Sequence, residues 1–536
     1  MRFLLILLTV AAMLDCAAGA EPFTLRDAIL MAVQTHPSVG EAAANRRATE
    51  AELRQQQGTL LPQIRIEANA GPERTNQRDA IVPPINNNKW VAGSEASIVL
   101  RQLLFDGFTS INEIWRQAAR VNGAAARVHE RSGLAALDAA EAYIDVVRYT
   151  RLVALARENL AAHQRIASNV ESRFRGGRAG EGDLEETRER VESARAALEQ
   201  FRQNLDEARG KFRKSVGTEP YNLRVPGRLP NLPVSKDQAL AVTLTKNPTI
   251  RAAQADVDAA HYAFRSTAGA FLPTVSLEAR ATEGNDTDNF VGHFSQESVK
   301  AVASWNIFSG GQDGWKRAEA AERYTEETMR HARLQREAFE SIDKAWAART
   351  ITNDRIAALV RQIAADKKVI VAYGKEYDLG QRSLIDLLNA ENQLFNAQVA
   401  LESAKGVAVF ADYQLLAAMG KLLEYVKAPH SIDAEPLKTA SYGLIPYTLP
   451  PIITKLPNRG PDPANVAHPA PAAAPLQYAP MQKSQKSESF MQRWAASVGQ
   501  LKPNNVTDFS GMKMDSPIGP QSTAINLLSA PFSFRE

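Results

Sequence analysis

The residue types that perform catalysis are present in this sequence, but not in catalytic patterns. The eight histidines are spread along 536 residues without a metal-binding spacing such as His-Glu-x-x-His. No phosphate-binding glycine loop or nucleophile-bearing serine turn occurs. The net charge is only +3, with basic and acidic residues interspersed, so no nucleic-acid partner is predicted. We therefore predict that this chain is not an enzyme and has no catalytic site, metal site or cofactor.

Polar and charged residues instead mark a motif that occurs twice. The second copy runs from Tyr377 to Glu402, and the first from Phe174 to Glu199. Matching residues are 203 positions apart throughout: Phe174 and Tyr377, Gly177 and Gly380, Gly180 and Ser383, Asp183 and Asp386, Leu184 and Leu387. Each copy is a long helical run, a glycine-marked break and a second run that opens near an aspartate. The pattern predicts the bend of a helical hairpin, with glycine supplying backbone freedom.

The duplication extends over most of the chain. Pro37 matches Pro248, and Pro62 matches Pro273, at a separation of 211. The difference of eight residues falls between Pro62 and Leu104, which predicts an exposed loop there. We predict a first repeat over 21–217 (β-hairpin 62–105, tip 174–183), a proline-marked linker over 218–233, and a second repeat over 234–427 (β-hairpin 273–308, tip 377–386).

The repeats contain very long helical stretches. Thr109–Phe174 contains no proline, and about 65 residues would span about 100 Å of helix. Apolar residues recur every three or four positions, which is typical of coiled-coil packing. The predicted helices are Leu25–Gln56, Thr109–Phe174, Lys236–Ser266, Gly314–Lys375 and Ser383–Lys421.

The two ends of the chain differ from the repeats. Residues 1–20 resemble a secretory signal peptide, with an apolar core over Phe3–Leu14 and small residues at Ala18–Ala20. A membrane anchor would need about 20 apolar residues, and a lipid-modified Cys16 would follow a small residue rather than Asp15. No other stretch approaches a membrane-spanning helix, so any membrane entry must use strands. Residues 428–536 are proline-rich and are predicted to be mostly disordered.

Segments beside the predicted loop alternate polar and apolar side chains, as strands do. Runs after Pro62 and Pro273 are followed by returning runs at Glu95–Phe105 and Ser298–Phe308. Each run has about ten residues, the length of a tilted membrane strand. Two soluble β-hairpins on a small core are the alternative, but one face carries alternating charges. The apolar, lipid-facing set would be Ile64, Ile66, Val275, Leu277, Ala301 and Trp305, and the polar set Arg65, Glu67, Asn69, Ser276, Glu278 and Arg280.

Four strands cannot close a barrel, and an open edge in lipid leaves backbone groups unpaired. The chain must therefore oligomerise. Eight strands from two copies would enclose only side chains, whereas twelve strands from three copies could enclose water. The polar set would then line the lumen. The predicted fold is a mixed α and β membrane protein, in which four strands per chain build a trimeric barrel continued by a helical coiled-coil tunnel.

The duplicated strand and hairpin order, the Leu-Pro before each first strand, and the motif Tyr-x-x-Gly-x-x-Ser-x-x-Asp-Leu-Leu resemble the TolC family of outer membrane export channels. The resemblance covers roughly residues 21–427. It implies a homotrimer with a twelve-stranded barrel in the outer membrane and a tunnel in the periplasm. Its implied partners are a periplasmic adaptor protein, an inner-membrane ABC or RND transporter, and outer membrane lipid.

The resemblance also implies roles at the tips. Asp386 would contribute to a ring of carboxylates that narrows the periplasmic aperture, and Asn389 departs from the family pattern by leaving a second ring neutral. The alternative is that Asp386 and Asp183 simply start their helices. Tyr377 and Arg382 would hold the tip closed, with Arg382 paired to Asp183 or Glu181. The tip turns that would meet the adaptor contain Gly177, Gly180, Gly380 and Ser383.

The resemblance favours the outer membrane component of a type I protein secretion system. The alternatives are the outer membrane factor of a multidrug efflux pump, which has the same architecture, and a periplasmic coiled-coil scaffold that does not span the membrane. The exported cargo leaves no trace in the residues.

Overall fold

The computed structural model describes residues 22–74, 88–287, 292–429 and 431–437. The predicted signal peptide and the tail beyond residue 437 lie outside the described residues. The same order of elements occurs twice. The first half contains α2 (Leu25–Thr35), α3 (Pro37–Gly58), β1 (Gln63–Glu73), β2 (Val91–Phe105), α4 (Thr109–Arg175) and α5 (Glu181–Val216). The second contains α6 (Lys236–Lys246), α7 (Pro248–Ser266), η2 (Thr267–Phe271), β3 (Thr274–Asn285), β4 (His293–Ser304), α8 (Gln312–Asp378) and α9 (Leu384–Ala418), followed by α10 (Leu422–Tyr425) and η3 (Ile432–Ala434).

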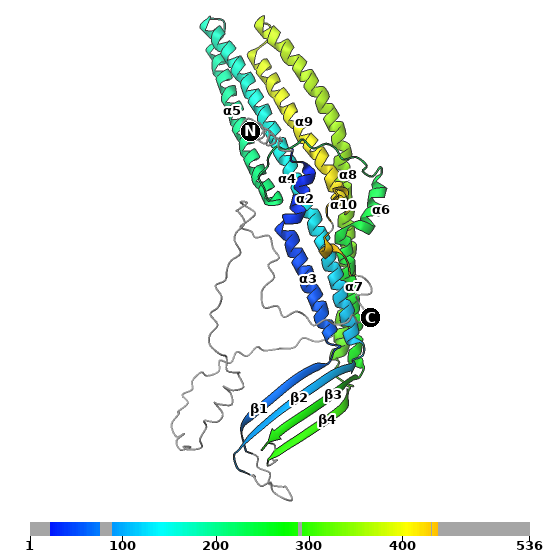
Figure 1. The fold of residues 1–536 in the computed structure, drawn as a ribbon. Helices are drawn as coiled ribbons and strands as arrows, with labels where there is room; N and C mark the ends of the chain where they lie inside the picture. Colours follow the sequence, from blue (N-terminus) through cyan, green and yellow to red (C-terminus); the bar gives the residue numbers. More distant parts are fainter. Residues whose placement is uncertain (1–21, 75–87, 288–291, 430, 438–536) are drawn as a thin grey trace, which may run out of the picture. The chain divides into compact units, whose positions relative to one another are not determined.

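The four strands form one antiparallel sheet in chain order, as Figure 1 shows. Strands β2 and β3 pair across the two halves, with Ile98 opposite Ala281. Only β2 and β3 have a partner strand on both sides among the described residues, so β1 and β4 are edge strands. Each edge strand therefore presents a row of backbone donors and acceptors that a further strand could pair with.

The strand register separates the predicted polar and apolar sets onto opposite faces. Arg65 lies opposite Val99, which in turn lies opposite Arg280 on β3. The guanidinium of Arg280 lies 3.9 Å from the carboxylate of Glu67, so charges from different strands meet on this face. On the other face, Leu277 lies opposite Ala301. The first set is Arg65, Glu67, Asn69, Ser276, Glu278 and Arg280, and the second Ile64, Ile66, Val275, Leu277 and Ala301.

The predicted strand over Ser298–Phe308 was wrong at both ends, because β4 runs from His293 to Ser304. Ser304 pairs with Thr274, the first residue of β3, and the preceding residue is Pro273. Beyond Ser304 the alternating sequence pattern continues, but no residue of β3 remains to pair with it. Trp305 therefore lies past the strand, where its indole N–H donates to the carbonyl of Phe271 at 3.3 Å.

The predicted helices before each hairpin are each broken in two. His36 and Asn247 have extended backbones, with ψ of 126° and 122°, and each precedes a proline. Proline disfavours the helical conformation of the preceding residue and fits the first turn of the next helix. The side chains of His36 and Asn247 then cap α3 and α7, accepting from backbone N–H groups of Ser38 and of Thr249 and Ile250. The shared break makes the two halves alike in this detail too.

The long helices pair as two hairpins, α4 with α5 and α8 with α9, which run side by side in Figure 1. Alanine dominates the buried seam of α4, where Ala136, Ala139 and Ala140 are fully buried. The helix α8 differs, because only Ala338, Ile342, Ala345 and Thr352 of its 67 residues are buried. Most of α8 therefore remains open to solvent in the single chain. In the described part of the chain, no helix combines the length and apolar character needed to cross a bilayer.

The linker between the halves is tied to the first residues described. Phe23 forms a bridge with Leu223, and its N–H donates to the carbonyl of Asn222 at 3.2 Å. The hydroxyl of Tyr143 in α4 donates to the carbonyls of Phe23 and Arg224, both at 2.7 Å. Burial raises the pKa of Tyr143 to about 12. This buried tyrosine therefore fixes two distant segments on the long helix.

Candidate functional site: the hairpin tips and the mid-helix clamp

The two hairpin tips turn in the same way. Gly177 and Gly380 have φ of +68° and +73°, the left-handed region that favours glycine. After the second turn, the hydroxyl of Ser383 accepts from the N–H of Asp386 at 3.3 Å and caps α9. Gly180 occupies the corresponding N-cap position of α5 without a side-chain cap. Ser383 therefore caps α9 and Asp386 lies in the first turn, as the helix-starting alternative for Asp386 states, and this position does not conflict with a role of Asp386 at an aperture.

Arg173, at the end of α4, joins the two tips of one chain. Its guanidinium lies 2.5 Å from a carboxylate oxygen of Asp378 and 4.6 Å from the ring centre of Tyr377. It also donates to the carbonyl of Tyr377 at 3.4 Å. Burial raises the pKa of the Tyr377 hydroxyl, Arg173 lowers it, and the nearby charge of Asp183 raises it. The charge of Asp183 on the first tip therefore influences Tyr377 on the second.

Arg382 makes different contacts from those predicted, and within one chain the predicted pairing with Asp183 or Glu181 was wrong. Its guanidinium lies 3.0 Å from Glu376 and 3.7 Å from Asp386, both in its own hairpin. It also lies 4.2 Å from the ring centre of Tyr373. Local i,i+4 and turn geometry holds Arg382 close to these partners. The arginine that bridges the tips is Arg173, from the first half.

The two predicted aperture residues differ in their surroundings. Asp386 is half-buried, and the charge of Arg382 lies against it. Asn389, one turn further along α9, is exposed. Both residues lie on the first two turns of α9. Of the two, only Asp386 carries a charge.

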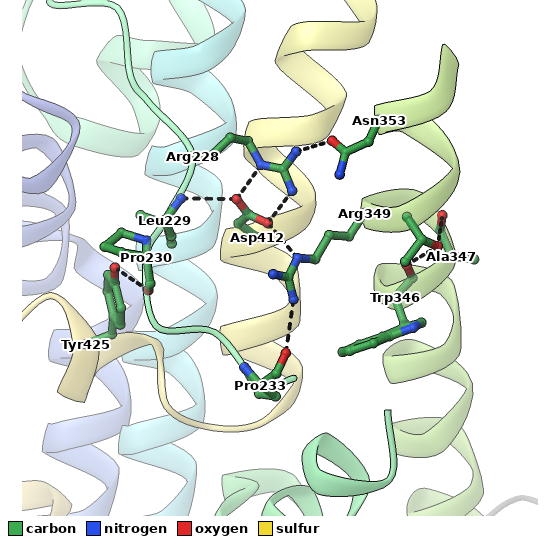
Figure 2. Close-up of polar contacts among 11 residues, drawn as sticks. Arg228, Leu229, Pro230, Pro233, Trp346, Ala347, Arg349, Asn353, Asp412 and Tyr425 are labelled. Atoms are coloured by element: carbon green, nitrogen blue, oxygen red, sulfur yellow. Dashed lines mark hydrogen bonds and ion pairs between the residues drawn. The ribbon is translucent and has the colours of Figure 1, made fainter. Parts of the chain in front are cut away.

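A buried carboxylate that sequence reasoning missed lies further along α9 (Figure 2). Asp412 is 1 % exposed and accepts from both Nε and Nη2 of Arg228, at 2.6 and 2.9 Å. Arg349 of α8 lies 3.5 Å from the same carboxylate, and the N–H of Leu229 donates to it at 3.1 Å. We call Asp412, Arg228 and Arg349 the mid-helix clamp. A lone aspartate in the apolar run GVAVFADYQLL was the available signal, because buried charges are normally paired.

The clamp fastens the linker to the second hairpin. Arg228 also donates to the side chain of Asn353 at 2.6 Å, and Arg349 donates to the carbonyl of Pro233 at 3.3 Å. Figure 2 shows these groups converging from the linker, α8 and α9. The linker thus contacts both helices of the second hairpin, α8 and α9, at one position along their length.

The start of the tail, which was predicted to be mostly disordered, packs against the first half over residues 431–437. The carboxylate of Asp433 lies 2.5 Å from Arg47 and 3.9 Å from Arg46. The N–H of Leu437 donates to the side chain of Asn122 at 2.8 Å. We call 431–437 the strap, because it returns from the second half to α3 and α4 of the first. Leucine 437 packs against a cluster of Leu53, Ile114, Ala118 and Val121.

Known proteins resemble this chain over both halves. The family model described as "Outer membrane efflux protein" matches residues 28–218 and 239–421. Among the relatives is the outer membrane efflux protein BepC of Brucella suis, 27% identical over 409 residues, covering 74% of this chain and 86% of the relative. Another is the alkaline protease secretion protein AprF of Pseudomonas aeruginosa, 23% identical over 449 residues, covering 81% and 91%. A third is TolC of Escherichia coli, 22% identical over 436 residues, covering 77% and 86%.

Solved structures show the same fold. The outer membrane protein VceC of Vibrio cholerae superposes with a TM-score of 0.66 at 17% identity, covering 74% of this chain and 96% of that one. CusC gives the same TM-score and identity, covering 74% and 92%. The family model matches more than half of the chain, in two stretches that each end in a long-helix hairpin. The chain therefore belongs to the outer membrane efflux protein family, the family of TolC, and is a transport protein of the outer membrane whose helical part lies in the periplasm.

Proposed function

We propose that three copies of this chain form an export channel through the outer membrane. The edge strands β1 and β4 carry the argument, because a four-stranded sheet with one apolar face cannot lie in lipid with open edges. Pairing β4 of one copy with β1 of the next satisfies both edges, and twelve strands enclose an aqueous lumen. The largely exposed helix α8 offers the neighbouring copies a second contact surface.

In such a trimer, the polar face of the sheet lines the lumen and the apolar face meets lipid. Arg65, Glu67 and Arg280 would then lie beside water, where their mutual ion pairs cost little. Ile64 and Ile66 are 69% and 74% exposed in the single chain, which suits a lipid-facing position. At the other end, Asp386 of each copy would face its equivalents around the periplasmic aperture.

We propose further that the channel serves a type I protein secretion system, with a periplasmic adaptor and an inner-membrane ABC transporter as partners. The relative AprF is named for alkaline protease secretion, which supports this assignment. The relative BepC is named as an efflux protein, which supports multidrug efflux with an RND transporter as the second candidate.

Three measurements test the channel. Detergent-extracted protein should migrate as a trimer, and cysteine crosslinks between β1 and β4 should join copies into dimers and trimers on denaturing gels. Thiol reagents that cannot enter lipid should label Glu67→Cys and spare Ile66→Cys in reconstituted bilayers. A monomer in detergent, or failure of the protein to sediment with membranes, would favour the scaffold alternative. Deletion in the host then separates the two export roles, through lost secretion of a protein or through increased drug sensitivity.

A further inference from the structure

An uncharged, amide-lined groove lies between α8 and α9, close to the second tip. It has a volume of about 350 Å³ and is lined by Leu359, Gln362, Asn389, Asn392, Gln393, Asn396, Ala397 and Ala400. Five of these eight side chains are amides, and none is charged or aromatic. All five amides are exposed. The amides on α9 recur every three or four residues, so they form a stripe along one face of the helix.

The amides of this groove have unused hydrogen-bonding groups in the single chain. In the described part of the chain, none of the five makes a hydrogen bond to the protein. Each amide offers two donors and one acceptor oxygen, so each can serve either a carbonyl or an N–H group. Glu391 is the one carboxylate in the segment of α9 that carries the stripe. Its half-buried side chain lies outside the groove lining, near Arg165 of α4.

The first half provides an internal comparison. The positions 203 residues earlier, on α5, carry Glu186, Glu189, Arg190 and Ser193 in place of Asn389, Asn392, Gln393 and Asn396. The fold of the two hairpins is alike, but the matching face is charged on α5 and neutral on α9. The amide stripe is therefore a property of the side chains and does not follow from the helical hairpin alone.

The composition of the groove discriminates between classes of ligand. A hydrophobic cation would be held by a carboxylate or an aromatic face, and the groove lining contains neither. A polypeptide backbone presents donors and acceptors alternately, which amides complement whatever their orientation. Helical turns repeat every ~5.4 Å, whereas alternate residues of an extended chain repeat every ~6.8 Å. The two repeats do not match, so no single register is strongly preferred and a chain can slide.

We propose that the amide-lined groove binds extended polypeptide through its backbone, as a contact surface for a protein cargo near the periplasmic mouth. The proposal rests on the export function proposed above and names polypeptide as the cargo class. Because the contacts are to backbone groups, binding is independent of cargo sequence and is weak at each site, since each hydrogen bond replaces one to water.

The test compares variants of the full-length, detergent-purified protein. The probe is a dye-labelled, uncharged and unstructured peptide rich in Gly, Ser and Gln, followed by fluorescence anisotropy. The variant N389A/N392A/Q393A/N396A removes the stripe, and alanine favours the helix, so α9 is retained. The matched control is Q200A/Q203A, two exposed amides of α5 that contact only neighbouring side chains of their own helix.

We expect the Kd for the peptide to rise about tenfold in the stripe variant, equivalent to about one net hydrogen bond, and to stay unchanged in the control. Equal binding by the wild-type protein and the stripe variant, or no binding by the wild-type protein, would overturn the proposal. The proposal would also be overturned if binding of ethidium, a hydrophobic cation, depended on the stripe and binding of the peptide did not. Conductance of these preparations in planar bilayers separates the two proposals. Normal conductance without stripe-dependent binding would refute the cargo groove and leave the channel standing. Absent conductance would refute the channel.

Discussion

Arg228 of the linker and Asp412 of α9 form a two-point ion pair, with distances of 2.6 and 2.9 Å between nitrogen and oxygen atoms. The carboxylate is almost completely buried, whereas the guanidinium is about one-third exposed. Such a pair gives geometric specificity, because both nitrogen atoms must meet both oxygen atoms. The clamp therefore sets where the linker crosses the second hairpin.

Arg228→Ala should destabilise the helical part of the protein by about 2–3 kcal/mol, because it leaves the buried charge of Asp412 with only the longer contact to Arg349 and the N–H of Leu229. Chemical denaturation followed by circular dichroism measures this change. Arg224→Ala is the matched control, since its exposed side chain lies in the same linker and only its backbone carbonyl binds Tyr143. Equal stability of the two variants would show that the clamp contributes nothing.

Arg173→Glu should open the tip, because it replaces the contact with Asp378 by repulsion and removes the cation over Tyr377. Single-channel conductance in planar bilayers should increase. Arg382→Glu should have a smaller effect, since Arg382 contacts its own hairpin within the chain. The opposite ranking would indicate that Arg382 binds a neighbouring copy in the assembled channel.

Asn389→Asp should increase the preference of the channel for cations, because it adds a second carboxylate one turn from Asp386. Fixed charges in a narrow opening set the local potential and the concentration of counterions. Reversal potentials in a salt gradient measure the change, and the increase should be lost at high salt, where screening is strong. If Asn389→Asp and Gln200→Asp gave the same selectivity, Asn389 would not lie at the aperture.

Asp433→Asn should loosen the strap, because it removes the charge that meets Arg47 and Arg46. A partly exposed pair of this kind contributes about 1 kcal/mol, so amide exchange within 431–437 should become about fivefold faster. Hydrogen exchange with mass spectrometry reads this out, with a peptide from α9 as the internal reference. Unchanged exchange in the strap would mean that Leu437 alone holds it.

His163 should make the first hairpin less stable in acid. Burial lowers the pKa of this imidazole, and Arg190 lowers it further. At a pH between the lowered pKa of His163 in the folded protein and the ordinary pKa of about 6.5, the unfolded chain binds more protons than the folded chain. The stability that depends on the neutral imidazole is therefore complete above that pH range and is lost as the pH falls through it. The loss is at most about 1.4 kcal/mol per pH unit.

His163→Leu should flatten this dependence, measured as the difference in unfolding free energy between pH 7.5 and 5.0. His331→Leu is the comparison, because that side chain is only partly buried and lies on α8. If both variants retained the full pH dependence of the wild-type protein, the acid sensitivity would belong to other groups.

Local pattern was sufficient to predict that the strands and long helices occur and which faces the strands have, but not where β2 and β4 begin. The alternation after Pro62 and Pro273 placed Arg65 and Glu67 on one face and Ile64 on the other, and the strand register agrees. Such faces follow from the two-residue period of a strand. The end of β4 was not predictable in this way, since it depends on where β3 begins and the backbone partners stop.

The breaks at His36 and Asn247 could have been predicted, because each precedes a proline. The periodic apolar pattern on both sides of each proline favoured one continuous helix and obscured the break. The structure shows that the rule for the residue before proline outweighs the periodicity at these two positions.

The duplicated architecture, the two-faced strands and the glycine turns at Gly177 and Gly380 follow from sequence alone, because each depends on residues close together in the chain. The contacts of Arg173 with Asp378, of Arg228 with Asp412 and of the strap with α3 are set by the packing of the folded chain. These partners lie hundreds of residues apart, and their meeting depends on the rotation and axial offset of packed helices. A periodic sequence specifies which face of a helix is buried, but not which residue of another helix lies opposite.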